Sequence, residues 1–264
     1  DFELSGGLIK NAVLSAISSA VARDGPEPTL TMEDLKKGAQ LQLRGSFQKD
    51  AIDRFMQPKC NLDDLVLSPS VRTEAKAVVA MDRGRRLLQT RYGWGKAASG
   101  GAGTRAPLIL LYGPLGCGKS SVASAIGYEC GQALRLVSVS ELLSKYAADT
   151  YKNVERIFRE AKRTACIPVF EEVQMLIGHD AGGAAHDAVA ALKYCLWHFN
   201  SLVLMLAETT NVSTYENAFE FHSAINVHFP SPQCRAALWM QCILQSPAFN
   251  EDCGGAGDWL GYDA

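Results

Sequence analysis

A glycine-rich loop between an apolar run and a helix-compatible segment constrains this chain more than any other feature. The apolar run Leu108–Tyr112 has strand length, and the loop Gly113–Gly118 leads into Lys119 and Ser120. Together they satisfy the pattern G-x-x-x-x-G-K-[ST] in a strand–loop–helix context. Glycines let consecutive backbone N–H groups wrap a polyphosphate, which the positive end of the following helix faces. The stretch predicts a phosphate-binding loop; the alternative is a glycine-rich turn that binds nothing.

The positions of this loop have expected roles toward a bound nucleotide, ATP or ADP. Lys119 would reach the β- and γ-phosphates, and the hydroxyl of Ser120 would ligate Mg²⁺. The residues expected to hold the nucleotide are Gly113, Pro114, Leu115, Gly116, Cys117, Gly118, Lys119, Ser120 and Ser121. The pattern is specific for nucleotide binding and says nothing about hydrolysis.

Composition excludes several classes of partner. The 264 residues are 47% apolar, enough for a buried core in one large domain or two smaller ones. A net charge of −2 gives no overall field for nucleic acid or an anionic membrane, and the basic cluster at residues 83–86 is interpreted as a solvated helix face rather than a nucleic-acid contact. The longest apolar runs, about six residues, are far shorter than the ~20 of a membrane-spanning helix. Eight cysteines without a C-x-x-C pair favour the cytoplasm or another reducing intracellular compartment.

The first 45 residues form a small helical unit in our prediction. Ser5 can cap a helix whose apolar positions recur at helical spacing until the breaking residues 24–26. Thr31 with Asp34 three residues later resembles a capping box that starts a second helix, which runs through Leu43. Two short helices cannot bury their apolar stripes alone, so we expect them to pack on another surface.

The rest of the chain reads as an α/β fold. Residues 46–70 are polar and poorly periodic, like a linker, and a helix over 70–90 and a glycine-rich loop over 93–103 follow. Strands and helices then alternate, which predicts a parallel sheet covered by helices, with ligands at the carboxyl ends of the strands. The predicted strands are 107–112, 134–139, 166–170, 202–207 and 225–229, and the predicted helices are 118–130, 150–165, 184–199 and 231–244.

From the glycine loop onward the sequence resembles the AAA+ ATPases, specifically the classical branch that includes the valosin-containing protein and related bacterial tandem modules. The resemblance covers Asn61 to Pro232, and Phe2–Asn11 is similar to the start of the family's helical lid. It implies a P-loop NTPase fold, a three-layer αβα core with a parallel sheet, preceded here by a small all-α lid-like unit.

The order of the units differs from the family, which places its lid after the core. The resemblance therefore implies that residues 1–45 are the lid-like unit of a preceding module and that residues 46–70 are a linker and the start of the core. Residues 71–247 would be the nucleotide-binding core, and residues 248–264 a tail that leads toward an absent lid. The alternative is a permuted arrangement in which the N-terminal unit serves its own core.

The apolar stretch that ends in Glu171-Glu172 matches the family's second acidic motif. The resemblance implies that the first acid, Glu171, holds the Mg²⁺ shell, although it is one methylene longer than the usual Asp. The second acid, Glu172, would act as general base toward the attacking water. Two surface glutamates at the end of a strand are the alternative.

Two further segments are similar to family sites. Tyr146, which follows Lys145, stands where the family's pore loop carries the aromatic residue that grips a threaded polypeptide; packing at a helix edge is the alternative. After the strand near residue 206, the family has a polar residue that orients the hydrolytic water. Asn211 or Thr209 would fill that role, which makes Asn211 a candidate catalytic residue. Adenine is expected near Leu65–Leu67, which resembles the family's N-terminal core loop.

The arginine fingers of the family are missing. Ala218-Phe219-Glu220 is followed by Phe221 and His222 where the family has two arginines that reach a neighbouring subunit's nucleotide. The resemblance implies an ATPase that remodels or threads protein in a hexameric ring or tandem assembly with other AAA modules. The departures favour the alternative, a catalytically impaired nucleotide-binding module with a structural role. A P-loop kinase would need an acceptor pocket that the sequence does not display.

Overall fold

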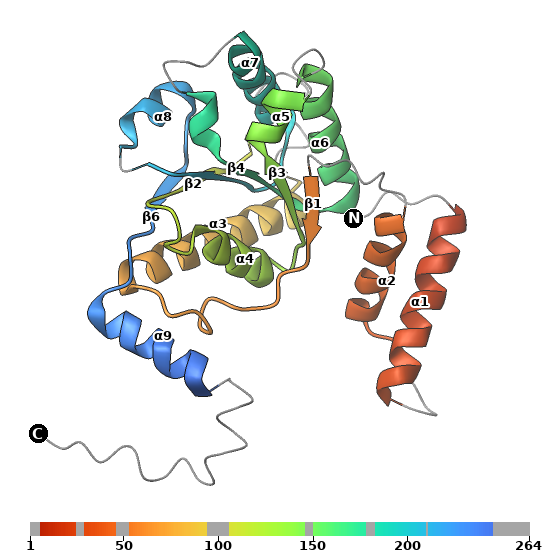
Figure 1. Cartoon of the computed structure of the whole chain (residues 1–264). Helices are drawn as coiled ribbons and strands as arrows, with labels where there is room; N and C mark the ends of the chain where they lie inside the picture. The colour runs from red at the N-terminus through yellow and green to blue at the C-terminus, as the bar shows by residue number, and fades with distance from the viewer. Residues whose placement is uncertain are drawn as a thin grey trace, which may run out of the picture.

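The computed structural model describes residues 6–24, 29–45, 53–93, 106–145, 150–177, 183–209 and 211–244. Over these ranges the chain forms an N-terminal pair of helices and a layered core (Figure 1). Most of the glycine-rich loop predicted over residues 93–103, and the tail at residues 248–264, lie outside the described ranges.

The core is built on a six-stranded sheet in the order β1-β3-β4-β5-β2-β6. The parallel strands are β2 (Leu108–Tyr112), β3 (Leu134–Ser138), β4 (Ile167–Glu171), β5 (Val203–Ala207) and β6 (Ser223–Asn226). Four of these strands were predicted within two residues at either end. Their runs of apolar residues are buried on both faces, as is typical of parallel strands covered by helices.

Helices cover both faces of this sheet (Figure 1). One face carries α3 (Pro69–Arg91) and α4 (Lys119–Cys130), and the other carries α5 (Val139–Lys145), α6 (Thr150–Thr164), α7 (Gly183–His198) and α8 (Ser213–Ala218). A short 3₁₀ helix, η2 (Val173–Leu176), follows β4, and α9 (Pro232–Leu244) follows β6. The predicted three-layer αβα fold is therefore confirmed. Alternate side chains of β2 enter the two cores, Ile109 and Leu111 on the α3–α4 face, Leu108 and Leu110 on the other.

The structure corrects two predictions about the sheet. The strand predicted over 225–229 is β6, Ser223–Asn226, because its partner β2 stops at Tyr112, where the glycine loop begins. The segment predicted as a linker, 46–70, contains β1 (Asp53–Met56), which pairs antiparallel with β3 and forms one edge of the sheet. The sheet is thus parallel except for this edge strand.

The N-terminal pair consists of α1 (Gly6–Asp24) and α2 (Met32–Gly45). Alanines 12, 16 and 20 of α1 are buried, and a Cβ on Gly38 of α2 would lie 2.3 Å from the carbonyl oxygen of Ala12, so the two backbones approach closely. The predicted capping box is present: the Asp34 N–H donates to Thr31 Oγ1 at 3.3 Å, and the Thr31 N–H donates to Asp34 Oδ2 at 3.0 Å. Arg23 of α1 also pairs with Asp34 at 2.8 Å, which links the two helices.

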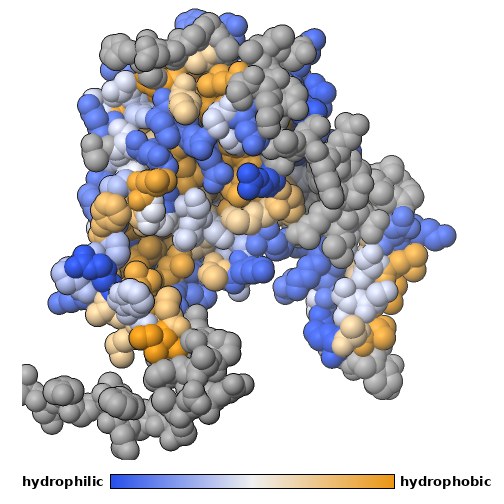
Figure 2. Space-filling view, viewed as in Figure 1, coloured by the Kyte–Doolittle hydropathy of each residue, from blue (hydrophilic) through white to orange (hydrophobic). Residues whose placement is uncertain are grey.

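A second face of α1 is exposed and apolar. Its large residues recur every four positions and are Ile9, Val13, Ile17 and Val21. Apolar colour is visible over this pair of helices and over α9 in Figure 2, where Trp239, Met240 and Ile243 are exposed. That the pair packs on another surface stays a prediction.

Two general features bear on the environment of the chain. Within the described ranges, none of the helices combines the length and the apolarity that a membrane span requires. Every cysteine in those ranges is a free thiol.

Two glycines with open space around them should respond oppositely to a methyl group. Gly84 lies inside α3, whereas Gly131 caps α4 with φ +64°. Gly84→Ala should raise the free energy of unfolding by about 0.5–1 kcal/mol, because alanine favours the helix interior. Gly131→Ala should lower it by about 1–2 kcal/mol, because a Cβ disfavours the left-handed region. Urea unfolding of both variants measures the difference, and equal signs would contradict the assigned backbone.

Candidate nucleotide-binding site

The glycine loop has backbone geometry that only glycine adopts readily. Gly113, Gly116 and Gly118 have φ of 148°, 77° and 98°. A Cβ on Gly113 would lie 2.1 Å from the carbonyl oxygen of Val227, just beyond β6, whereas Cβ atoms on Gly116 and Gly118 would meet nothing within 4 Å. The first glycine therefore permits close contact with the neighbouring strand, and the other two permit the turn that opens α4.

Lys119 places its ammonium group inside this loop. The residue is 8% exposed, and Nζ donates to the carbonyl oxygens of Gly113 at 2.9 Å and Pro114 at 2.7 Å. Cys117 Sγ lies 3.9 Å from the same nitrogen. A buried ammonium group is costly without partners, so these loop carbonyls hold a positive charge where an anion can approach it.

The acidic pair lies at the carboxyl end of β4, next to the loop. Burial raises the pKa of Glu171, and the nearby charge of Glu172 raises it further. The positive charge of Arg54 in β1 and a hydrogen bond with Ser120 lower this pKa in part. Ser120 is thus close enough to Glu171 to lower the pKa of its carboxyl group, and their role as metal ligands stays a prediction. Both are oxygen ligands of the kind that Mg²⁺ takes beside phosphate oxygens and water.

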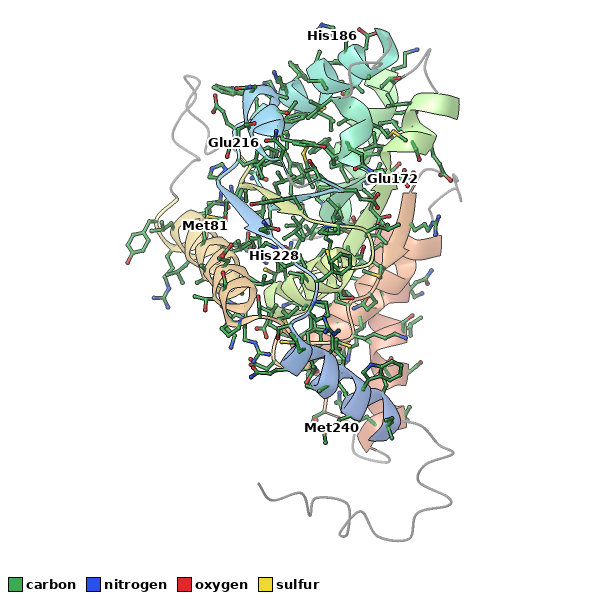
Figure 3. All side chains as sticks on the ribbon, turned by 60° about the vertical axis from the view of Figure 1, so that its left-hand side comes forward. Met81, Glu172, His186, Glu216, His228 and Met240 are labelled. Carbon is green, nitrogen blue, oxygen red and sulfur yellow. The ribbon has the colours of Figure 1, made fainter. Side chains whose placement is uncertain are left out.

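Glu172 has an unusual conformation and environment. Its φ is 61° and its ψ is 38°, in the left-handed region that non-glycine residues enter at a cost. Its Oε2 atom is buried and has no hydrogen-bond partner in the described part of the chain. Figure 3 labels this residue. A buried carboxylate oxygen without a donor is a strong acceptor, and it suits a water or a proton that the bound state would supply.

The polar segment after β5 is organised around its own turn. The Asn211 N–H donates to Thr209 Oγ1 at 3.0 Å, and Asn211 Oδ1 accepts from the Ser213 N–H at 3.2 Å and from Ser213 Oγ at 2.7 Å. Asn211 is exposed, and these bonds do not reach the acidic pair. Sequence reasoning missed Gln174 of η2, whose Oε1 accepts from the Glu208 N–H at 3.1 Å and joins the acidic motif to the end of β5.

An apolar pocket of about 210 Å³ lies beside the loop. The segment Leu65–Leu67, where adenine was expected, forms one wall, and Gly116 and Gly118 form another. Further lining residues come from the end of β6 and the start of α9, and they are Val227, His228, Phe229, Pro230, Cys234 and Leu238. Sequence analysis had no signal for these residues, because only the fold brings them to the loop.

Two predicted sites remain: the pore-loop residue Tyr146 and the segment that stands where the family has its arginine fingers. Tyr146 lies outside the described residues, so its role in gripping a polypeptide stays a prediction. The segment where the family has its arginine fingers, residues 218–222, leads from α8 into β6 and contains Glu220. Among the described residues, no cluster of three or more His, Cys, Asp or Glu side chains is placed to hold a metal ion.

The fold and the loop together define a P-loop nucleotide-binding domain. Residues 109–233 match the model of the ATPase family associated with various cellular activities (AAA). Over these residues the chain carries an AAA ATPase-family domain, so the predicted family is confirmed. Members of this family generally bind and hydrolyse ATP.

Curated relatives agree with this assignment. The chain is 40% identical over 85 residues to the peroxisomal ATPase PEX1 of Dictyostelium discoideum, which covers 31% of the chain and 7% of that protein. It is 31% identical over 140 residues to protein SUPPRESSOR OF K(+) TRANSPORT GROWTH DEFECT 1 of Arabidopsis thaliana, and the match covers 50% of this chain and 32% of that protein. It is 30% identical over 165 residues to the nuclear valosin-containing protein-like protein of Mus musculus, and the match covers 58% of this chain and 19% of that protein. The chain thus spans a third or less of each.

A solved structure supports the fold. The crystal structure of the FIGL-1 AAA domain aligns with a TM-score of 0.55 and 16% identity, over 78% of this chain and 65% of that one. At this identity the likeness concerns the fold alone.

Proposed function

We propose that the chain binds Mg-ATP at the glycine loop, with adenine in the pocket beside Leu65–Leu67. The observation that carries this proposal is the buried ammonium group of Lys119, held by the carbonyls of Gly113 and Pro114 at the centre of the loop. A bound polyphosphate would pair with this ammonium group in place of the loop carbonyls. The backbone N–H groups of the loop and of the first turn of α4 would donate hydrogen bonds to the phosphate oxygens. The pocket offers apolar surface for a flat base.

Ser120 and Glu171 would hold the metal ion, Glu171 through bound water. The ion would neutralise phosphate charge when it is bound with the nucleotide. Support for this role comes from the closeness of Ser120 to Glu171 and from the burial of Glu171, which raises the pKa of its carboxyl group.

Glu172 would act as general base in hydrolysis. Its buried Oε2 atom lacks a donor, so it can accept a proton from a water positioned against the γ-phosphate. Asn211 or Thr209 would orient that water. Since Asn211 Oδ1 is engaged with Ser213, Asn211 would have to exchange this bond for one with the water.

Hydrolysis would be coupled to protein remodelling in a ring, hexameric as in the family, or in a tandem assembly. Support comes from the AAA domain and from relatives whose names describe peroxisomal and nuclear ATPase-family proteins. Tyr146 would contact a polypeptide substrate, and residues 1–45 would be the lid-like unit of a preceding module. The free thiols suit a reducing intracellular compartment.

A catalytically impaired module is the second candidate, and specific observations favour it. Glu220 stands in the segment where the family has positive fingers, so the charge that would stabilise the transition state is missing from this chain. Glu171 replaces the shorter Asp, and the side-chain oxygen of Asn211 is already hydrogen-bonded. Such a module would bind ATP and transmit conformational change to active neighbours.

Turnover and binding, measured separately, distinguish the two candidates. We expect saturable Mg-ATP binding by calorimetry and a turnover per chain that rises with protein concentration as the assembly forms. Turnover that stays at background while binding is tight would leave the impaired module. Failure to bind Mg-ATP at about millimolar concentration would contradict both.

A further inference from the structure

A groove of about 370 Å³ lies far from the glycine loop, on the α5–α8 face of the sheet. Its walls are the C-terminal half of α7, the end of α8 and the residues that lead into β6. The nucleotide pocket borders α3, α4 and α9 on the other face, and Figure 3 labels Glu216 of the groove and His228 of the nucleotide pocket on different sides of the sheet. We refer to the former as the α7–α8 groove; its volume is in the range of ligand pockets.

Aromatic side chains form one side of this groove and continue beyond it. Trp197 of α7 lines the groove and is 49% exposed, and the buried Phe219 lines it as well. Tyr194, three residues earlier on the same helical face, is 54% exposed; its ring lies 4.5 Å from that of His198 and 6.0 Å from that of Tyr151. Exposed aromatic residues grouped on one helical face are typical of interaction surfaces.

Carboxylates also line the groove. Glu216 of α8 and Glu220, which follows it by four residues, both line the groove and are exposed. The groove also already contains one cation over an aromatic ring: Lys193 Nζ lies 6.0 Å from the ring centroid of Phe219. Aromatic faces beside carboxylates are the surroundings that attract ammonium and guanidinium groups.

We propose that the α7–α8 groove docks a lysine- or arginine-containing peptide segment of a partner protein. Charge complementarity selects this occupant, because two carboxylates oppose a single lysine and would repel an acidic peptide or a nucleic-acid phosphate. The partner's cation lies in the groove that Trp197 and the two glutamates line, and its neighbouring side chains lie along the exposed aromatic face. This proposal does not depend on nucleotide binding.

Lys193 gives the proposal a distinctive signature. Its ammonium group competes with an incoming cation for the ring of Phe219 and for the carboxylates that line the same groove. Lys193→Met keeps most of the length of the side chain and removes the charge. The variant therefore binds a basic peptide more tightly than the wild type, whereas truncation of a merely structural residue weakens binding.

The test is fluorescence anisotropy with the full 264-residue chain and defined probes. One probe is a labelled peptide of about nine residues in which arginine alternates with glycine, and the matched probe has glutamate in place of arginine. We expect saturable binding of the arginine probe alone, with and without Mg-ATP. The Glu216→Gln/Glu220→Gln double variant should raise its Kd about tenfold, and Lys193→Met should lower it about threefold.

The control is the Glu33→Gln/Glu74→Gln double variant, which removes the same charge from the exposed surfaces of α2 and α3 and should leave Kd within twofold. Thermal unfolding verifies that each variant is folded. Absence of saturable binding, equal binding by both probes, or equal Kd values in the two double variants would overturn the proposal. So would sedimentation showing that the groove variant changes self-association, because the occupant would then be a second copy.

Discussion

Glu172→Gln is expected to lower ATP turnover at least about a hundredfold while leaving Mg-ATP affinity within about threefold. Glutamine has the same shape as glutamate, so the left-handed backbone at this residue and the packing of η2 should persist. The amide oxygen can still accept a hydrogen bond from water, but it cannot take the proton. The loss should therefore fall on the chemical step and not on ground-state binding.

The burial of Glu172 sharpens this expectation. Its Oε2 atom is buried without a donor in the described part of the chain, and an unsatisfied buried polar atom lowers the stability of the wild type. Replacement by a neutral amide relieves that cost, and thermal unfolding of the variant should show equal or slightly higher stability. A catalytic role thus predicts lower turnover together with preserved or improved stability, a combination that a structural role does not produce.

A matched control separates the base from the effect of charge. Glu74→Gln alters a half-buried glutamate of α3 that accepts from Ser70 Oγ at 2.8 Å, a bond that glutamine can keep. Its turnover should equal that of the wild type in a steady-state phosphate-release assay. If Glu172→Gln hydrolyses ATP as fast as Glu74→Gln, then Glu172 is not the base, and any turnover arises elsewhere.

Much of the core was predictable because local pattern and burial coincide there. The apolar run Val203–Ala207 is buried at every position, and a continuous apolar run predicts such a strand. α6 alternates buried residues such as Val154, Ile157 and Phe158 with charged ones, which gives the helical period directly. The glycine loop was predictable for a different reason, since its backbone geometry requires glycine at Gly113, Gly116 and Gly118.

The elements that sequence analysis missed are short, and the ends of some are set by partners far away in the chain. β1 has four residues and exists because β3 offers a free edge, which no periodicity in residues 53–56 reveals. α8 has six residues and starts at a turn built by Asn211 and Ser213. The end of β6 is fixed by where β2 stops, so the predicted extension to residue 229 was wrong for a reason outside the strand itself.

The candidate site shows the same division. Lys119, Ser120 and Glu172 belong to short motifs, and the sequence assigns them roles without a structure. The pocket residues Val227 and Phe229 lie more than a hundred positions from the loop and reach it only because β6 pairs with β2. Arg54 likewise influences Glu171 only through the order β1-β3-β4. Motif spacing therefore predicts the residues proposed to bind the phosphates, and the strand order brings together the residues of the pocket proposed for adenine.

Lys119→Ala should reduce the affinity for Mg-ATP about a hundredfold or more. The lysine would donate charge-assisted hydrogen bonds to the β- and γ-phosphates, each worth about 1.5–3 kcal/mol. None of the described residues that line the pocket beside the loop is a lysine or an arginine that could replace it. Two lost bonds correspond to at least about 3 kcal/mol, which is more than a hundredfold in Kd. Calorimetric titration with Mg-ATP measures the change.

Thermal stability provides an independent readout, because a ligand that binds only the folded state stabilises it. At a nucleotide concentration of a hundred times Kd, the wild type should gain about 2.7 kcal/mol, a Tm rise of a few degrees for a chain of this size. Lys119→Ala should gain little under the same conditions. Without nucleotide the two proteins should unfold at similar temperatures, because the carbonyls of Gly113 and Pro114 lose only one donor that water can replace.

Lys162→Ala is the matched control, since Lys162 is an exposed lysine in the last turn of α6. It should retain both the affinity for Mg-ATP and the nucleotide-dependent rise in Tm. If Lys119→Ala also retains them within about fivefold, the glycine loop does not bind the polyphosphate in this chain. The left-handed glycines and the buried ammonium group would then describe a turn that shares the geometry of a phosphate-binding loop without its function. Both features are present in the folded protein without bound nucleotide, so neither of them by itself requires nucleotide binding.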